Sequence, residues 1–153
     1  WCEENNFTMF SYYYMQSKSV YFFKSLFDSA FSDFNFKELS FKPLSVDEIV
    51  SYFKEASIVL DINHPEQRGL TMRTFEALGA GRKIITTNSE IKTYSFYDAN
   101  NIFVIDRDCV VLDKAFFALD FNPIDEDTLF EMSITGWIKS LFIQNDPYYW
   151  LNT

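Results

Sequence analysis

The sequence predicts an α/β protein with a parallel sheet flanked by helices. Its main signal is three short apolar runs rich in β-branched residues, Ser57–Asn63, Lys83–Asn88 and Asn101–Asp106. Such runs are typical of strands that are buried on both faces of a parallel sheet. Apolar residues at helical spacing separate the first two runs, and strands that alternate with helices indicate a parallel sheet. We expect a single domain over residues 1–153, since this length suits one domain.

Four elements are predicted ahead of these strands. They are a strand at Phe7–Met15, a helix at Lys18–Phe31, a strand at Asn35–Leu44 and a helix at Val46–Ala56. The last helix has the clearest start, because Glu48 follows Ser45 at the spacing of a capping box.

The remaining elements are mostly helical. A short helix is predicted at Thr71–Leu78, with Met72, Phe75 and Leu78 facing the core and Gly81 as its C-cap. The other predicted segments are a loop with a helical turn at Ser89–Asn100, an apolar helical or extended segment at Val110–Leu119, and a helix at Glu126–Phe142 interrupted near Gly136.

Charge and cysteine content exclude several classes of function. The formal net charge of −9 repels polyphosphate, so we expect no general nucleic-acid binding. Cys2 and Cys109 have no partner at a metal-binding spacing, so a zinc site is not expected, and reduced thiols fit better than a disulfide. Aromatic residues make up 20% of the chain, which favours a core rich in Phe over a carbohydrate-stacking surface.

The chain is expected to be a piece of a longer cytoplasmic protein. No apolar run reaches the length of a membrane span, and the first residues do not resemble a signal peptide. The sequence also begins without Met.

The loop and helix after the first buried strand carry the chemistry. In open parallel sheets ligands bind at the carboxyl ends of strands, where the first turn of a helix offers unpaired N–H groups. Gly69 would let a ligand approach the backbone, and Arg68 and Arg73 flank that point. This pattern predicts a diphosphate site. Glu76, farther along the helix, is suited to accept both hydroxyls of a ribose, although it is equally spaced to pair with Arg73.

Several other polar residues are candidates with two interpretations. The only histidine, His64, would contact a phosphate or act as an acid or base, or it is a loop residue without a role. Asp61 would act as a base, or it caps the loop that follows its strand. Thr86, Thr87 and Asn88 end the next strand at the same edge and are candidate pocket residues.

Residues Gly69-Leu70, Phe75-Glu-Ala-Leu-Gly-Ala-Gly81 and the strand at Lys83–Thr87 resemble the C-terminal domain of retaining GT-B glycosyltransferases of the group-1 (family-4-like) type. The stretch Ser57–Arg107 is similar to a subgroup from bacterial surface-polysaccharide or lipopolysaccharide biosynthesis. The resemblance implies a Rossmann-like sheet that forms the C-terminal half of a GT-B fold. It also implies that Glu76 binds the ribose of a nucleotide-sugar, and that Gly69, Leu70 and Thr71 line the diphosphate.

The sequence departs from this family in its charged residues. Position 68 is Arg where the family has a glutamate, and the spacing from glycine to glutamate is longer. The basic pair that the family places earlier in the domain has no match, and Arg68 and Arg73 are candidates to replace it.

The resemblance implies transfer of a sugar from a nucleotide-diphospho-sugar to a growing polysaccharide or lipopolysaccharide. It implies no metal and no cofactor besides the donor. The glycan or glycolipid acceptor would be held by a missing N-terminal domain, so the isolated chain is expected to be inactive. The full-length protein is expected in the cytoplasm, with peripheral association at the inner face of the membrane. The catalytic residues are not identified. The alternative is a non-catalytic interaction domain that keeps a degenerate GT-B fold.

Overall fold

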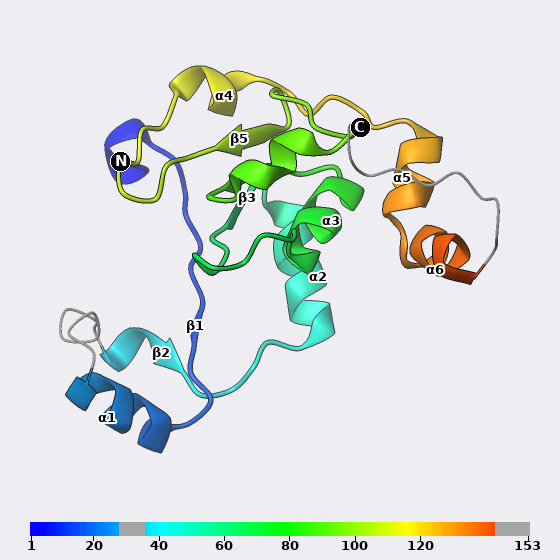
Figure 1. The fold of residues 1–153 in the computed structure, drawn as a ribbon. Coiled ribbons are helices and arrows are strands. Elements are labelled where there is room, and N and C mark those ends of the chain that lie inside the picture. The colour runs from blue at the N-terminus through cyan, green and yellow to red at the C-terminus, as the bar shows by residue number, and fades with distance from the viewer. Residues whose placement is uncertain (28–35, 143–153) are drawn as a thin grey trace. The chain divides into compact units, whose positions relative to one another are not determined.

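The computed structural model describes residues 1–27 and 36–142 (Figure 1). The fold is α/β, with two small parallel sheets and flanking helices, consistent with a Rossmann-like arrangement. Contacts divide the chain into two compact units, Trp1–Ile49 and Val50–Thr153. The single domain over residues 1–153 stays a prediction.

The first unit has little regular structure. Strands β1 (Tyr13–Tyr14) and β2 (Leu39–Ser40) pair in parallel, and α1 (Lys18–Phe27) lies between them in sequence. Short 3₁₀ helices occupy Glu3–Asn5 and Phe36–Glu38. The predicted helix agrees with α1 as far as Phe27, and its remainder lies outside the described residues.

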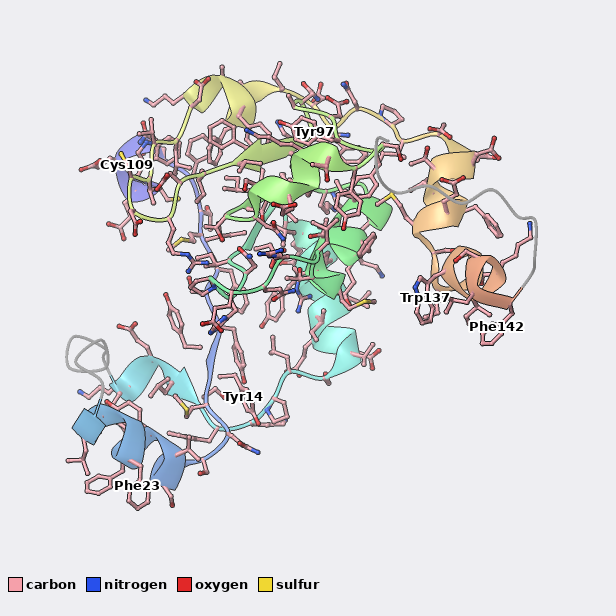
Figure 2. All side chains as sticks on the ribbon, in the orientation of Figure 1. Tyr14, Phe23, Tyr97, Cys109, Trp137 and Phe142 are labelled. Carbon is pink, nitrogen blue, oxygen red and sulfur yellow. The ribbon has the colours of Figure 1, made fainter. Side chains whose placement is uncertain are left out.

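The two strands predicted in this unit are too long. Among the described residues of this unit, only Tyr13–Tyr14 and Leu39–Ser40 form a ladder. Near the start of the second predicted strand, residues Phe36–Glu38 form a 3₁₀ helix instead. No residue of this unit whose burial is described is buried, and Phe23 of α1 is exposed (Figure 2). A run of aromatic residues forms a long strand only where one face of its sheet packs against other residues. The described part of this unit has no such packing.

Helix α2 (Val46–Glu55) begins at the predicted capping box. The backbone N–H of Ser45 donates to Oε2 of Glu48 at 2.8 Å, and the N–H of Glu48 donates to Oγ of Ser45 at 3.3 Å. The bonds from Ser45 lower the pKa of the Glu48 carboxyl. This helix start is therefore fixed by neighbouring residues alone.

The second unit contains a three-stranded parallel sheet with strand order β3-β4-β5. The strands are β3 (Ile58–Asp61), β4 (Lys83–Thr86) and β5 (Ile102–Val104), and all four residues of the central strand β4 are buried. The prediction that the first run is buried on both faces is wrong for β3, because Leu60 is 54% exposed. β3 is an edge strand among the described residues, and Leu60 lies outside the core cluster on its face of the sheet.

Two apolar clusters cover the two faces of this sheet. One cluster joins Ile84 and Ile102 to Ala77 and Leu78 of α3 (Met72–Gly79). The other joins Ile85 to Phe116 of α4 (Lys114–Ala118). Helices on both faces are the expected cover for a parallel sheet. A 3₁₀ helix at Ser89–Thr93 matches the helical turn predicted between the second and third strands.

The predicted inner face of α3 is partly wrong. Leu78 is buried, as predicted, and Phe75 packs against the core cluster, but Met72 is 67% exposed. Thr74 is buried instead, because its hydroxyl donates to Oδ2 of Asp61 at 3.2 Å. This polar contact turns the helix so that Met72 points outward.

Two helices end the described chain, α5 (Glu126–Met132) and α6 (Ile134–Phe142). The interruption predicted near Gly136 lies at Ser133, which has an extended backbone and whose Oγ accepts from the N–H of Gly136 at 3.0 Å. Trp137 and Phe142 of α6 are exposed (Figure 2). Within residues 1–27 and 36–142, no helix combines the length and the apolar character needed to cross a membrane.

Candidate functional site

Polar residues gather where the parallel strands β3, β4 and β5 end. We call this set the strand-end cluster and define it by its six members: Asp61, Asn63, Thr71, Thr87, Asn88 and Arg107. Parallel strands end at one edge of a sheet, so residues distant in sequence meet there. The hydrogen bonds among these residues span from 10 to 44 positions of sequence.

Asp61 fastens the start of α3 to the end of β3. Its Oδ2 accepts from the hydroxyl of Thr71 at 2.6 Å and from that of Thr74 at 3.2 Å, and the residue is only 7% exposed. This arrangement agrees with the interpretation of Asp61 as a cap of the following loop and not as a base, because its carboxylate accepts hydrogen bonds from two hydroxyls. Because the Thr71 hydroxyl is directed to Asp61, α3 has no side-chain cap at its N-terminus. The first turn of α3 therefore presents N–H groups without a side-chain acceptor.

Asn63, Thr87 and Arg107 join the loops that follow the three strands. The Thr87 hydroxyl donates to Oδ1 of Asn63 at 2.6 Å. Nη2 of Arg107 donates to Oγ1 of Thr87 at 3.3 Å and to the backbone oxygen of Asn63. One nitrogen of Arg107 thus holds the ends of β3 and β4 beside its own loop.

Asn88 holds the loop between β3 and α3 against the end of β4. Its Nδ2 donates to the backbone oxygens of Arg68 at 3.2 Å and Gly69 at 3.1 Å. A Cβ built on Gly69 would meet nothing within 4 Å, so open space lies beside this backbone. Asn88 therefore anchors the backbone of the loop that the sequence predicts to bind a ligand. Open space lies beside the same loop at Gly69.

Besides Gly69, four of the predicted site residues lie in or beside this loop. Thr71 is bonded to Asp61, and Leu70 packs against the core cluster. The side chains of His64 and Arg68 are exposed. Nδ1 of His64 accepts from the N–H of Glu66 at 3.3 Å, so the neutral ring carries its proton on Nε2 and offers a donor there.

Arg73 and Glu76 pair with each other on α3. Nη1 of Arg73 lies 2.8 Å from Oε2 of Glu76, and the two side chains are 40% and 48% exposed. The guanidinium also lies 5.3 Å from the centre of the Phe53 ring. No hydrogen bond joins this pair to the strand-end cluster in the described part of the chain. The structure therefore brings Thr71, Gly69 and Arg68 near the strand ends but gives Glu76 a different partner.

Two cavities lie away from the strand-end cluster. One, of about 310 Å³, is lined by β5, α4 and the segment between β4 and β5. The other, of about 230 Å³, is lined by the end of α3 and by residues between Phe121 and Leu129. Glu76 lines neither cavity. Over residues 1–27 and 36–142, no three His, Cys, Asp or Glu side chains group as metal ligands.

Arg107 and Asn63 are the residues of this site that sequence reasoning missed. Asn63 is the last residue of the first predicted strand and Arg107 follows the third, and that position at a strand's carboxyl end was the available signal. Neither a family model, a curated protein nor a solved structure matches this chain. The site is therefore interpreted from its own residues.

Proposed function

We propose that the strand-end cluster and the start of α3 bind a nucleotide-diphospho-sugar, the donor of a bacterial glycosyltransferase. The observation that carries this proposal is the uncapped N-terminus of α3 at the carboxyl ends of the parallel strands. Helix N-termini bind phosphate through free N–H groups and the positive end of the helix dipole. Gly69 leaves space there, and Arg68 adds a nearby positive charge.

Glu76 is assigned to the ribose in this proposal, which requires its ion pair with Arg73 to open. The pair is well exposed, and exposed ion pairs contribute about 0–1 kcal/mol. Exchanging it for two hydrogen bonds from a ribose costs little. Arg73 would then be free to turn towards the ligand, as the sequence expectation for this residue requires.

The wider role follows from the same resemblance. The enzyme would transfer the sugar to a polysaccharide or lipopolysaccharide at the inner face of the membrane, without a metal. A partner domain would hold the acceptor, so this chain alone should not turn over the donor. Rapid transfer by the isolated chain would contradict this part of the proposal.

A second function, a non-catalytic interaction domain, is favoured by one observation. Glu76 is paired with Arg73 and lies at neither cavity. Arg68 stands where the family has a glutamate, which points the same way. Under this alternative the fold remains but no nucleotide binds.

Thermal unfolding with a panel of UDP-, GDP- and ADP-sugars separates the two functions. Donor binding predicts a rise in melting temperature with one nucleotide, lost in Glu76→Ala. Arg73→Ala is the matched control, since it breaks the same ion pair but leaves the carboxylate free. Loss of the ligand effect in Glu76→Ala but not in Arg73→Ala assigns the contact to the carboxylate alone, whereas loss in both variants assigns a ligand contact to each residue. If no nucleotide raises the melting temperature of the wild-type chain, the interaction-domain alternative holds.

A further inference from the structure

Helix α6 has large apolar residues on one side and small or polar residues on the other. At about 3.6 residues per turn, five apolar side chains share one side, which we call the apolar stripe: Ile134, Trp137, Ile138, Leu141 and Phe142. All five are between 46% and 79% exposed. The other side of the helix consists of Thr135, Gly136, Lys139 and Ser140. A helix of a globular protein ordinarily turns its apolar side towards the core.

The side of α6 that packs against α5 is the polar one. Gly136 is buried, and a Cβ built on it would clash with the backbone of Phe130. Nζ of Lys139 lies 5.6 Å from the centre of the Phe130 ring. Trp137 and Phe142 project from α6 away from α5 (Figure 2). The apolar stripe therefore stays exposed, and a contiguous apolar patch of this kind marks an interaction surface.

The order of residues across the apolar stripe indicates a lipid surface. Ile134, Ile138 and Leu141 lie along its middle, whereas Trp137 and Phe142 lie along its two edges. In helices that lie in a membrane interface, aliphatic side chains reach the acyl chains and aromatic rings sit near the headgroups. Protein interfaces favour the reverse order, because their aromatic anchors cluster near the centre.

We propose that the apolar stripe of α6 binds the surface of a lipid bilayer, with the helix lying in the plane of that surface. The inference is carried by the residues of α6 and goes beyond the nucleotide site. It names the surface that the membrane association in the proposed function would use, and it rests on that function in this respect alone.

The charge of the chain sets which lipids this surface prefers. Glu126 and Asp127 of α5 are exposed, and the formal net charge is −9. Anionic headgroups therefore repel the chain, and the apolar contact supplies the binding energy. We expect neutral lipids to bind better than anionic lipids, with the difference decreasing as salt is added.

Co-sedimentation of the full chain with phosphatidylcholine vesicles tests the proposal. Leu141→Asp should weaken vesicle binding about tenfold or more, because the variant loses an inserted leucine and has to desolvate a carboxylate. Leu60→Asp is the matched control: it makes the same substitution at a leucine of β3 that is 54% exposed, and vesicle binding should be unchanged. Vesicles that also contain phosphatidylglycerol should bind the wild-type chain less at low salt.

Fluorescence shows whether α6 itself enters the lipid. In the double variant Trp1→Phe, Trp150→Phe, Trp137 is the remaining tryptophan. Its emission should shift to shorter wavelength as phosphatidylcholine vesicles are added, because the ring leaves water. An unchanged emission during vesicle binding overturns the role of α6.

The other outcomes separate this inference from its alternatives and from the donor proposal. Vesicle binding that persists in Leu141→Asp, or wild-type protein that binds neither kind of vesicle, overturns the lipid contact. Self-association in place of vesicle binding, abolished by Leu141→Asp, overturns it in favour of a second copy of the chain. If Leu141→Asp fails to fold, Ile134→Asp decides the matter. Vesicle binding without a nucleotide effect on melting temperature leaves the role of α6 standing and overturns the donor site, whereas a nucleotide effect without vesicle binding does the opposite.

Discussion

The hydroxyl of Thr71 donates to Oδ2 of Asp61 at 2.6 Å, although Thr71 is the N-cap residue of α3. A threonine at this position ordinarily accepts a hydrogen bond from the first turn of its own helix. Here the hydroxyl is directed to the strand end instead, and α3 begins without a side-chain cap. One contact therefore joins the start of the helix to the strand end and leaves the first turn without a side-chain cap.

Asp61→Ala should destabilise the second unit. The substitution leaves the buried hydroxyl of Thr74 and the half-buried hydroxyl of Thr71 without their acceptor, which costs about 1–3 kcal/mol. Asp61→Asn should cost less, because both hydroxyls donate to one oxygen of Asp61 and the amide oxygen of asparagine can still accept from them. Urea unfolding measures both values, with Asp108→Asn as the exposed control expected within about 0.5 kcal/mol of wild type. If Asp61→Ala is as stable as wild type, the hydrogen bonds from Thr71 and Thr74 to Asp61 do not stabilise the second unit.

Gly81 and Gly79 should respond in opposite ways to alanine. The C-cap of α3 is Ala80 and not Gly81 as predicted; Gly81 follows it with φ +67°, and its N–H donates to the oxygen of Leu78 at 3.0 Å. Alanine there costs about 1 kcal/mol for the left-handed backbone, with no steric clash since the nearest atoms are 4.0 Å away. Gly79 is the last residue of α3, and a Cβ built there meets nothing within 4 Å, so alanine should stabilise the helix by up to about 1 kcal/mol. Equal changes in the free energy of unfolding would contradict the prediction.

Lys83 should make stability depend on pH in the alkaline range. Its Nζ donates to the backbone oxygens of Phe116 and of Leu119, the latter at 2.8 Å, and the residue is 3% exposed. Burial lowers the pKa of this ammonium group below 10.5, and Asp120 opposes the shift. Between the lowered folded pKa and 10.5 the unfolded chain holds more protons, so stability contributed by Lys83 increases as pH rises.

Lys83→Met removes this titration. The free energy of unfolding of wild type, measured relative to Lys83→Met, should increase as the pH rises through the alkaline range towards 10.5. Lys92→Met, at an exposed position, serves as the comparison and should give a flatter difference. Parallel stability curves for wild type and Lys83→Met would refute the assigned shift.

Gly136 should tolerate no side chain. A Cβ there would lie 2.2 Å from the backbone oxygen of Phe130 and 3.0 Å from Cα of Glu131. Gly136→Ala forces α6 away from α5, at a cost of about 1–3 kcal/mol. Thr135→Ala, at an exposed position of α6, is the control, and should change stability by no more than about 0.5 kcal/mol. Proteolysis between the two helices, compared for the two variants, would reveal the loosened contact.

The sequence by itself determined the elements whose signals are local. The capping box of Ser45 and Glu48, the buried strand at Lys83–Thr86 and the left-handed glycine after α3 all depend on near neighbours or on a short apolar run. The alternation of helices and strands was enough to predict a parallel sheet. In the first unit the predicted strands are longer than the observed ones. No residue of this unit whose burial is described is buried, and composition alone does not determine which residues pair in a sheet.

Tertiary structure alone decided which polar groups meet at the strand ends. Arg107 reaches Asn63 across 44 positions of sequence, and Thr87 reaches it across 24. Such pairs depend on the order of strands in the sheet, which no local pattern encodes. The same is true of Asp61, whose two hydroxyl donors turned Thr74 inward and Met72 outward. Local patterns set where each element begins and ends, whereas the partners of buried polar groups follow from how those elements are assembled.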